Sequence, residues 1–150
     1  MEMNLLKLPK RMEEVLLEVY GRGKRESDVA RELGISKQAV SKFLREGRAR
    51  LTEIFVEVAE MFHADIVRIS LNKGYAIIRP RQLKIRAYVV YVPGIGPRIL
   101  FGEDIICEGE TRKLCREVIK AFRSWSLLDK CSQEVNEASI IKCVIKTIEE

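Results

Sequence analysis

The segment from Glu26 to Arg45 constrains the fold most, because its pattern predicts two helices joined by a tight turn. Ser27 is expected to cap the first helix, since its hydroxyl can accept from an unpaired backbone N–H of the first turn. Gly34 stands where this helix must stop and the backbone must become left-handed, which glycine does without steric penalty. Ser36 is expected to cap the second helix in the same way.

Apolar residues at helical spacing give each of these helices an inward face. They are Val29, Ala30 and Leu33 in the first helix and Ala39, Val40 and Phe43 in the second. Ala30 is small, as it must be where two helices cross at a sharp angle. The spacing of Ala30, Gly34 and Val40 therefore predicts a helix-turn-helix.

The stretch from Asp28 to Ser41, Asp-Val-Ala-Arg-Glu-Leu-Gly-Ile-Ser-Lys-Gln-Ala-Val-Ser, resembles the helix-turn-helix of prokaryotic transcription regulators. It is most similar to LuxR-type domains, the C-terminal DNA-binding region of sigma factors and the archaeal Tfx-type regulators. The resemblance covers about residues 9–50, and the C-terminal half does not share it. It implies binding to double-stranded DNA with the second helix in the major groove, in a prokaryotic setting that includes the archaea.

The predicted recognition helix runs from Ser36 to about Gly47 and carries polar and cationic residues opposite its apolar face. These candidate DNA contacts are Lys37, Gln38, Ser41, Lys42 and Arg45. Gln38 and Ser41 are expected to face bases, since glutamine can pair with adenine. Candidates for phosphate contacts are Arg22, Lys24, Arg25, Arg48 and Arg50. A protein-contact role for the motif is the alternative, and so are simple solvated charges at Lys24 and Arg25.

Helical spacing also predicts a first helix from Pro9 to Tyr20. Its inward stripe comprises Met12, Val15, Leu16 and Val19, and its outer face comprises Glu13, Glu14 and Glu18. We interpret the stripe as core that supports the helix-turn-helix.

The helical pattern does not stop at Arg45 but continues to His63. The apolar members of this extension are Leu51, Ile54, Phe55, Val58, Ala59 and Phe62. This stripe can pack on the C-terminal half or pair with the same helix of a second subunit. A homodimer is the favoured prediction, because two-fold symmetry doubles the half-sites contacted.

From Asp65 the period changes to that of strands. Asn72 to Gly74 predicts a hairpin turn, with a first strand before it and a second strand from Tyr75 to Ile78. A third strand is expected from Leu83 to Val92, then the tight connection from Pro93 to Pro97 and a strand from Arg98 to Phe101. Ile105 to Cys107 is expected to add a short edge strand.

This predicted sheet has no acidic residue between Ile66 and Gly102, against seven basic ones: Arg68, Lys73, Arg79, Arg81, Lys84, Arg86 and Arg98. Arg68 and Lys73 are candidate wing contacts to DNA if the hairpin lies beside the recognition helix. An anionic small-molecule effector, in a pocket with Tyr88 and Tyr91, is a second interpretation. A solvated sheet face is the third.

Helices are predicted from Glu110 to Trp125 and over the last segment, whose apolar residues are Val135, Ala138, Ile141, Val144, Ile145 and Ile148. The fold class is therefore α+β: a helix-turn-helix domain (1–50), a connecting or dimerisation helix (51–63) and a sheet with two C-terminal helices (64–150). No catalytic constellation is apparent, since His63 is the single histidine and lies among helix-core residues. The sequence thus predicts a binding protein, not an enzyme, and requires no cofactor.

The four cysteines, at 107, 115, 131 and 143, include no close pair of the kind that binds zinc, so no metal site is expected. Buried thiols are the simplest interpretation, and disulfides are the alternative if the source is a hyperthermophile. The net charge of +5 fits a polyanion partner. Because the sequence contains neither an apolar signal core nor a bilayer-length apolar run, we expect no membrane association and a cytoplasmic location.

Overall fold

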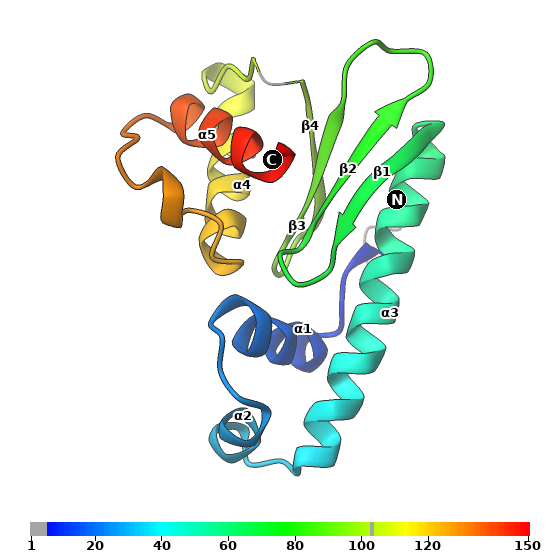
Figure 1. The fold of residues 1–150 in the computed structure, drawn as a ribbon, viewed down its shortest axis with the longest axis vertical. Helices are drawn as coiled ribbons and strands as arrows, with labels where there is room; N and C mark the ends of the chain where they lie inside the picture. Colours follow the sequence, from blue (N-terminus) through cyan, green and yellow to red (C-terminus); the bar gives the residue numbers. More distant parts are fainter. Residues whose placement is uncertain (1–5, 103) are drawn as a thin grey trace.

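The computed structural model describes residues 6–102 and 104–150 and contains a four-stranded antiparallel sheet between two helical layers (Figure 1). The strands follow one another in the sheet: β1 (Ala64–Ser70), β2 (Tyr75–Pro80), β3 (Ala87–Val92) and β4 (Gly96–Phe101). Helix α3 (Lys37–Met61) covers one face, and α4 (Arg112–Ser124) and α5 (Glu137–Glu149) cover the other. The predicted α+β class is confirmed.

The strand register shows which side chains face each layer. Ala87 lies between Ile78 and Phe101 in one cross-strand row, and the Phe101 ring meets the Phe62 ring edge to face, with centroids 5.6 Å apart. That row therefore faces α3, because Phe62 is the C-cap of this helix. Tyr88 belongs to the opposite face, where its hydroxyl donates to Glu149 of α5 at 2.6 Å.

The N-terminal helices pack at the lower end of α3 (Figure 1). Helix α1 (Lys10–Leu16) continues into a π-helical turn (Leu17–Gly21), and α2 (Glu26–Leu33) follows. Gly47 lies where α1 crosses α3, and a Cβ atom there would be 2.9 Å from both Met12 and Leu16. Glycine inside a helix costs about 1 kcal/mol relative to alanine. The close approach of α1 explains why α3 nevertheless has glycine at this position.

Two predictions for the N-terminal helices are wrong. Helix α2 begins at Glu26 with Arg25 at its N-cap position, so Ser27 lies inside the first turn and does not cap the helix. Glu13 does not lie on an outer face, because it accepts from the Tyr91 hydroxyl at 2.7 Å and from the Gly94 N–H at 2.9 Å. This carboxylate therefore joins α1 to the sheet.

The apolar stripe of α3 is used within the chain. Leu51, Ile54 and Phe55 are fully buried and belong to the same core as the sheet. The prediction that this stripe pairs with a second subunit is therefore wrong, and the alternative of intramolecular packing holds. None of the helices in the described ranges is both long and apolar enough to span a bilayer.

The sheet prediction needs three corrections. Strand β3 begins at Ala87, because residues 81–86 form a loop in which Leu83 and Ile85 are exposed. Strand β2 runs on to Pro80 and β4 begins at Gly96. Residues 105–107 form no strand, and Cys107 is bonded to Cys115 of α4.

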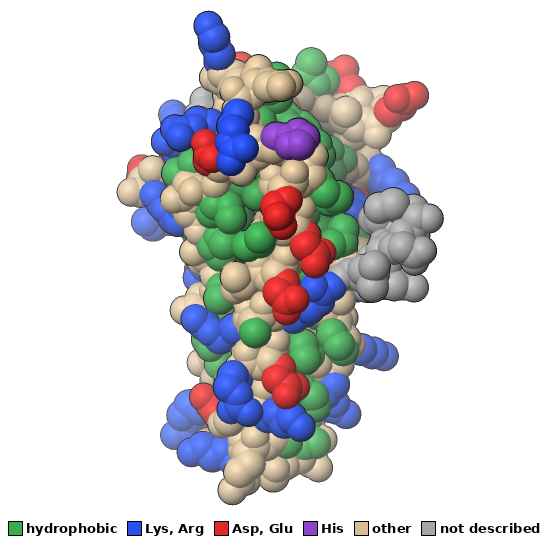
Figure 2. Space-filling model, turned by 90° about the vertical axis from the view of Figure 1, so that its right-hand side faces the viewer, with side chains coloured by type: hydrophobic (Ala, Val, Ile, Leu, Met, Phe, Trp, Pro, Cys, Tyr) green, Lys and Arg blue, Asp and Glu red, His purple; other side chains and the backbone are tan. Residues whose placement is uncertain are grey.

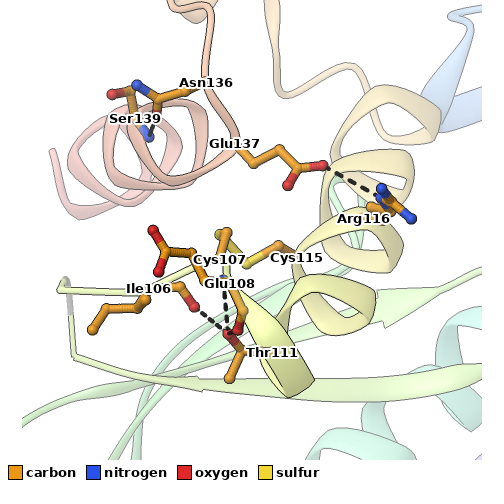
Figure 3. The surroundings of a disulfide bond; sticks show 9 residues. All are labelled: Ile106, Cys107, Glu108, Thr111, Cys115, Arg116, Asn136, Glu137 and Ser139. Carbon is orange, nitrogen blue, oxygen red and sulfur yellow. Dashed lines mark hydrogen bonds and ion pairs between the residues drawn. A yellow bond between two sulfur atoms is a disulfide. The ribbon is translucent and has the colours of Figure 1, made fainter.

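The four cysteines form two disulfides, Cys107–Cys115 and Cys131–Cys143. The prediction of buried free thiols is therefore wrong, and the disulfide alternative holds. Figure 3 shows the first bridge at the start of α4, where the Thr111 hydroxyl also donates to the Glu108 carbonyl at 2.9 Å. The bridges fasten the irregular segments before each C-terminal helix.

The C-terminal helices begin slightly later than predicted. A 3-10 turn (Gly109–Thr111) precedes α4, and another (Asp129–Cys131) lies between the helices. Asn136 caps α5, accepting from the Ser139 N–H at 2.8 Å. Val135 is therefore outside the helix and 91% exposed, contrary to its predicted place in the apolar stripe.

Candidate nucleic-acid interface

The turn between α2 and α3 has the geometry that its residues predict. Gly34 is left-handed (φ 67°), and the Ile35 N–H donates to the Ala30 carbonyl at 3.0 Å, a bond typical of glycine-terminated helices. The Ser36 hydroxyl accepts from the Ala39 N–H at 3.0 Å, which confirms the predicted cap. Val40 is fully buried, so the opposite face of α3 must point outward.

The five residues predicted to contact DNA are brought together on that outward face. All are exposed, and they line one open hollow: Lys37, Gln38, Ser41, Lys42 and Arg45. Ser41 donates its hydroxyl hydrogen to Oε1 of Glu26 at 2.9 Å. The other four make no hydrogen bond or ion pair with the rest of the described chain, so their polar groups are available to a ligand.

The candidate phosphate contacts differ in exposure. Arg22 and Arg25 are 71% and 80% exposed, although Arg22 lies 3.7 Å from Glu18 and Arg25 lies 3.0 Å from Asp28. Lys24 is 30% exposed and lies 2.7 Å from Glu32, whose hydrogen bond raises the pKa of the Lys24 ammonium. Arg50 is 25% exposed and lies 3.7 Å from Glu57. Lys24 and Arg50 are therefore the weaker candidates.

Arg48 connects the long helix to the β1–β2 hairpin. Its guanidinium lies over the Tyr20 ring, 5.4 Å from the centroid, and donates to Asn72 at 2.7 Å. The turn that contains Lys73 thus lies beside α3, just beyond the predicted recognition segment. Arg68 lies elsewhere, because its guanidinium donates to the Ile148 carbonyl of α5 at 2.5 Å.

Sequence reasoning missed three charged residues of α2 at this surface. Asp28 accepts from Arg25 at 3.0 Å and from Arg31 at 2.6 Å, and the Arg25 hydrogen bond lowers the pKa of the Asp28 carboxyl. Arg31 is 74% exposed and extends the cationic surface. The third is Glu26, the partner of Ser41. The i,i+3 spacing of residues 25, 28 and 31 is the signal that could have revealed the first two.

The predicted basic sheet face is not a continuous surface. Arg86 pairs with Glu149 at 2.5 Å and Arg98 with Glu117 at 2.9 Å, so both are neutralised by the helices that cover this face. Arg81 pairs with Asp65 at 2.9 Å. Tyr88 and Tyr91 are only 3% and 0% exposed, and each hydroxyl donates to a carboxylate. The proposed tyrosine-lined pocket for an anionic effector is therefore wrong.

Charge is unevenly distributed along the α3 side of the molecule (Figure 2). Lys and Arg side chains gather at the lower end, where the helix-turn-helix lies, and again at the upper end, and acidic side chains form a column between them. Glu53 and Glu60 are exposed members of the acidic half of α3. The lower end is therefore the part of α3 suited to a polyanion.

Neither a metal site nor a similar known protein helps to assign a function to this surface. The described residues hold no group of three His, Cys, Asp or Glu side chains that could bind a metal ion. No protein-family model matches the chain, and comparisons with curated proteins and with solved structures find no match either.

Proposed function

We propose that the protein is a sequence-specific double-stranded DNA-binding transcription regulator that inserts the first turns of α3 into the major groove. One observation carries this proposal: the exposed Lys37, Gln38, Lys42 and Arg45 project from one helix face whose opposite side is core. A rigid helix end with unpaired donors matches the dimensions and the acceptor pattern of the groove. The resemblance of residues 28–41 to prokaryotic regulators supports the same function.

In this proposal the side chains have different tasks. Gln38 and Ser41 read base edges, while Lys37, Lys42 and Arg45 contact bases or the adjoining phosphates. Arg22 and Arg25 reach phosphates on the flank, because they are the most exposed cations before and at the start of α2. Lys73 in the hairpin turn is a wing contact.

We also propose that the protein binds DNA as a homodimer. Since the α3 stripe is buried within the chain, the contact between subunits would use the C-terminal domain. Sedimentation analysis with and without a selected duplex tests this part. Two chains on one duplex are expected, and one chain per site would contradict it.

A cytoplasmic location is part of the proposal, because the ligand is chromosomal DNA. Disulfides are rare in that compartment, except in hyperthermophiles, whose intracellular proteins can carry them. The two bridges thus favour a hyperthermophilic source, in agreement with the archaeal resemblance.

Selection of bound fragments from random duplex DNA, at two salt concentrations, tests the proposed function. A shared sequence motif should emerge and should persist at the higher concentration, where phosphate contacts are weakened. Recovery of unrelated sequences, or no binding at either concentration, would reject sequence-specific binding and favour a protein-contact role for the motif.

A further inference from the structure

The hydrogen bond between Ser41 and Glu26 restricts what the Ser41 hydroxyl can do at a base edge. A serine hydroxyl has a single hydrogen to donate and two lone pairs that accept. The Ser41 oxygen lies 2.9 Å from Oε1 of Glu26 and donates to it. An ionised carboxylate only accepts, so this bond can form in one direction alone.

Glu26 is also an unusual neighbour for a DNA-binding surface. It is half-buried at the start of α2 and forms no ion pair within the described residues, while the hollow beside it is lined by four polar or cationic side chains and Ser41. A carboxylate here repels phosphates, which costs general affinity. Glu26 can nevertheless contribute to recognition, because its hydrogen bond orients the Ser41 hydroxyl.

We propose that Glu26 is a positioning residue that makes Ser41 an acceptor, so that Ser41 selects a base with an exocyclic amino group. In the major groove these bases are adenine, through N6–H₂, and cytosine, through N4–H₂. Guanine and thymine present carbonyl oxygens instead, which cannot bond to a hydroxyl whose hydrogen is already used. This inference depends on the proposed DNA-binding function and specifies part of its target.

The experiment repeats the selection with wild-type protein and with Ser41→Ala, Glu26→Gln and Glu32→Gln. Ser41→Ala identifies the base that Ser41 reads, as the one position where preference disappears. In wild type that position is expected to favour one base pair over its reversal, A·T over T·A or C·G over G·C, by about 5–10-fold, the lower end of the range for a bidentate pair. The reversal would place a carbonyl oxygen where the Ser41 oxygen accepts from an amino group. Circular dichroism verifies that each variant is folded.

Glu26→Gln is the decisive variant, because an amide can either accept from Ser41 or donate to it. It frees the hydroxyl to turn, so the preference at that one position should fall to less than about twofold while the other positions keep theirs. Glu32→Gln removes the same charge from an exposed position of the same helix, where the partner is Lys24. It is expected to change affinity for all sequences alike and to leave the preference at the Ser41 position intact.

Two outcomes overturn the inference while leaving DNA recognition in place: an unchanged preference in Glu26→Gln, or a uniform loss of affinity in Ser41→Ala. Failure of the wild type to select any motif rejects the proposed function itself, and the inference with it. The two failures are therefore distinguishable in one data set.

Discussion

The Tyr91 hydroxyl joins two parts of the chain that are 78 residues apart, because it donates to Glu13 of α1 at 2.7 Å from within the sheet. The same oxygen accepts from the Leu8 N–H at 2.8 Å. Glu13 also accepts from Gly94, beyond the end of β3. These bonds join α1 to the sheet, in addition to the apolar packing of α3 on its face.

Replacing Tyr91 by phenylalanine should lower the free energy of unfolding by about 1–3 kcal/mol, since a buried N–H and a carboxylate lose their partner. Tyr20→Phe is the matched control, because the Tyr20 hydroxyl makes no hydrogen bond with the described residues and phenylalanine keeps the ring under Arg48. Urea denaturation measures both variants. Equal stability of the two would show that the Tyr91 bonds contribute nothing.

Alkaline pH should destabilise the wild type more than Tyr91→Phe. Burial, chiefly, raises the pKa of the Tyr91 hydroxyl, and the Glu13 carboxylate raises it further. Above about pH 10 the unfolded chain loses the tyrosine proton while the folded chain keeps it, so stability falls as pH rises. The wild-type advantage over Tyr91→Phe should therefore shrink between neutral pH and about pH 11. A wild-type advantage in stability that grows as the pH rises would contradict this prediction.

Gly74→Ala should destabilise the fold severely. Gly74 is left-handed (φ 66°), and a Cβ atom there would overlap the buried Trp125 ring. Gly94→Ala is the control, because Gly94 has a similar φ of 78° but no described atom within 4 Å of its Cβ position. Gly94→Ala should cost about 1–2 kcal/mol for the backbone alone. Gly74→Ala should exceed that cost by a further 1–3 kcal/mol or so in thermal or urea unfolding.

Reduction should lower stability without changing DNA affinity. Each bridge closes a short loop, with sequence separations of 8 and 12 between the paired cysteines, so each is expected to contribute about 2–3 kcal/mol. The melting temperature should fall in dithiothreitol, and a variant with serine at all four cysteines should no longer respond. A reductant effect that persists in that variant would refute the assignment.

Much of the helix-turn-helix could be predicted from sequence because its signals are local. Gly34 and Ser36 each act on a backbone group within five residues, and both were interpreted correctly. The predicted cap at Ser27 is wrong because the helix begins just before it, at Glu26, and a serine pattern alone does not fix the first residue. The helix end was thus predictable, and its start was off by one or two residues.

Contacts between distant segments could not be predicted. The acidic face of α1 resembles a solvated surface in sequence, and only the approach of Tyr91 shows that Glu13 faces inward. The basic residues of the predicted sheet also resemble a solvated face in sequence, yet Arg86 pairs with Glu149 and Arg98 with Glu117. The predicted edge strand at residues 105–107 is wrong, and the bridge from Cys107 to Cys115 leaves no periodic signal in the sequence. In each case the error concerns a contact with a distant residue, and the periodicity of one sequence does not indicate such contacts.

The central claim is tested most directly by the affinity of the wild type, Gln38→Ala and Lys42→Ala for the selected duplex and for a scrambled one, measured across a range of salt. Gln38→Ala should lose about 1–3 kcal/mol on the selected duplex and nothing on the scrambled one. Lys42→Ala should weaken both equally and reduce the salt slope by about 1. Gln82→Ala and Lys113→Ala, at exposed positions outside the hollow, should match the wild type. If Gln38→Ala and Lys42→Ala bind both duplexes as the wild type does, the exposed face of α3 is not the DNA-reading surface.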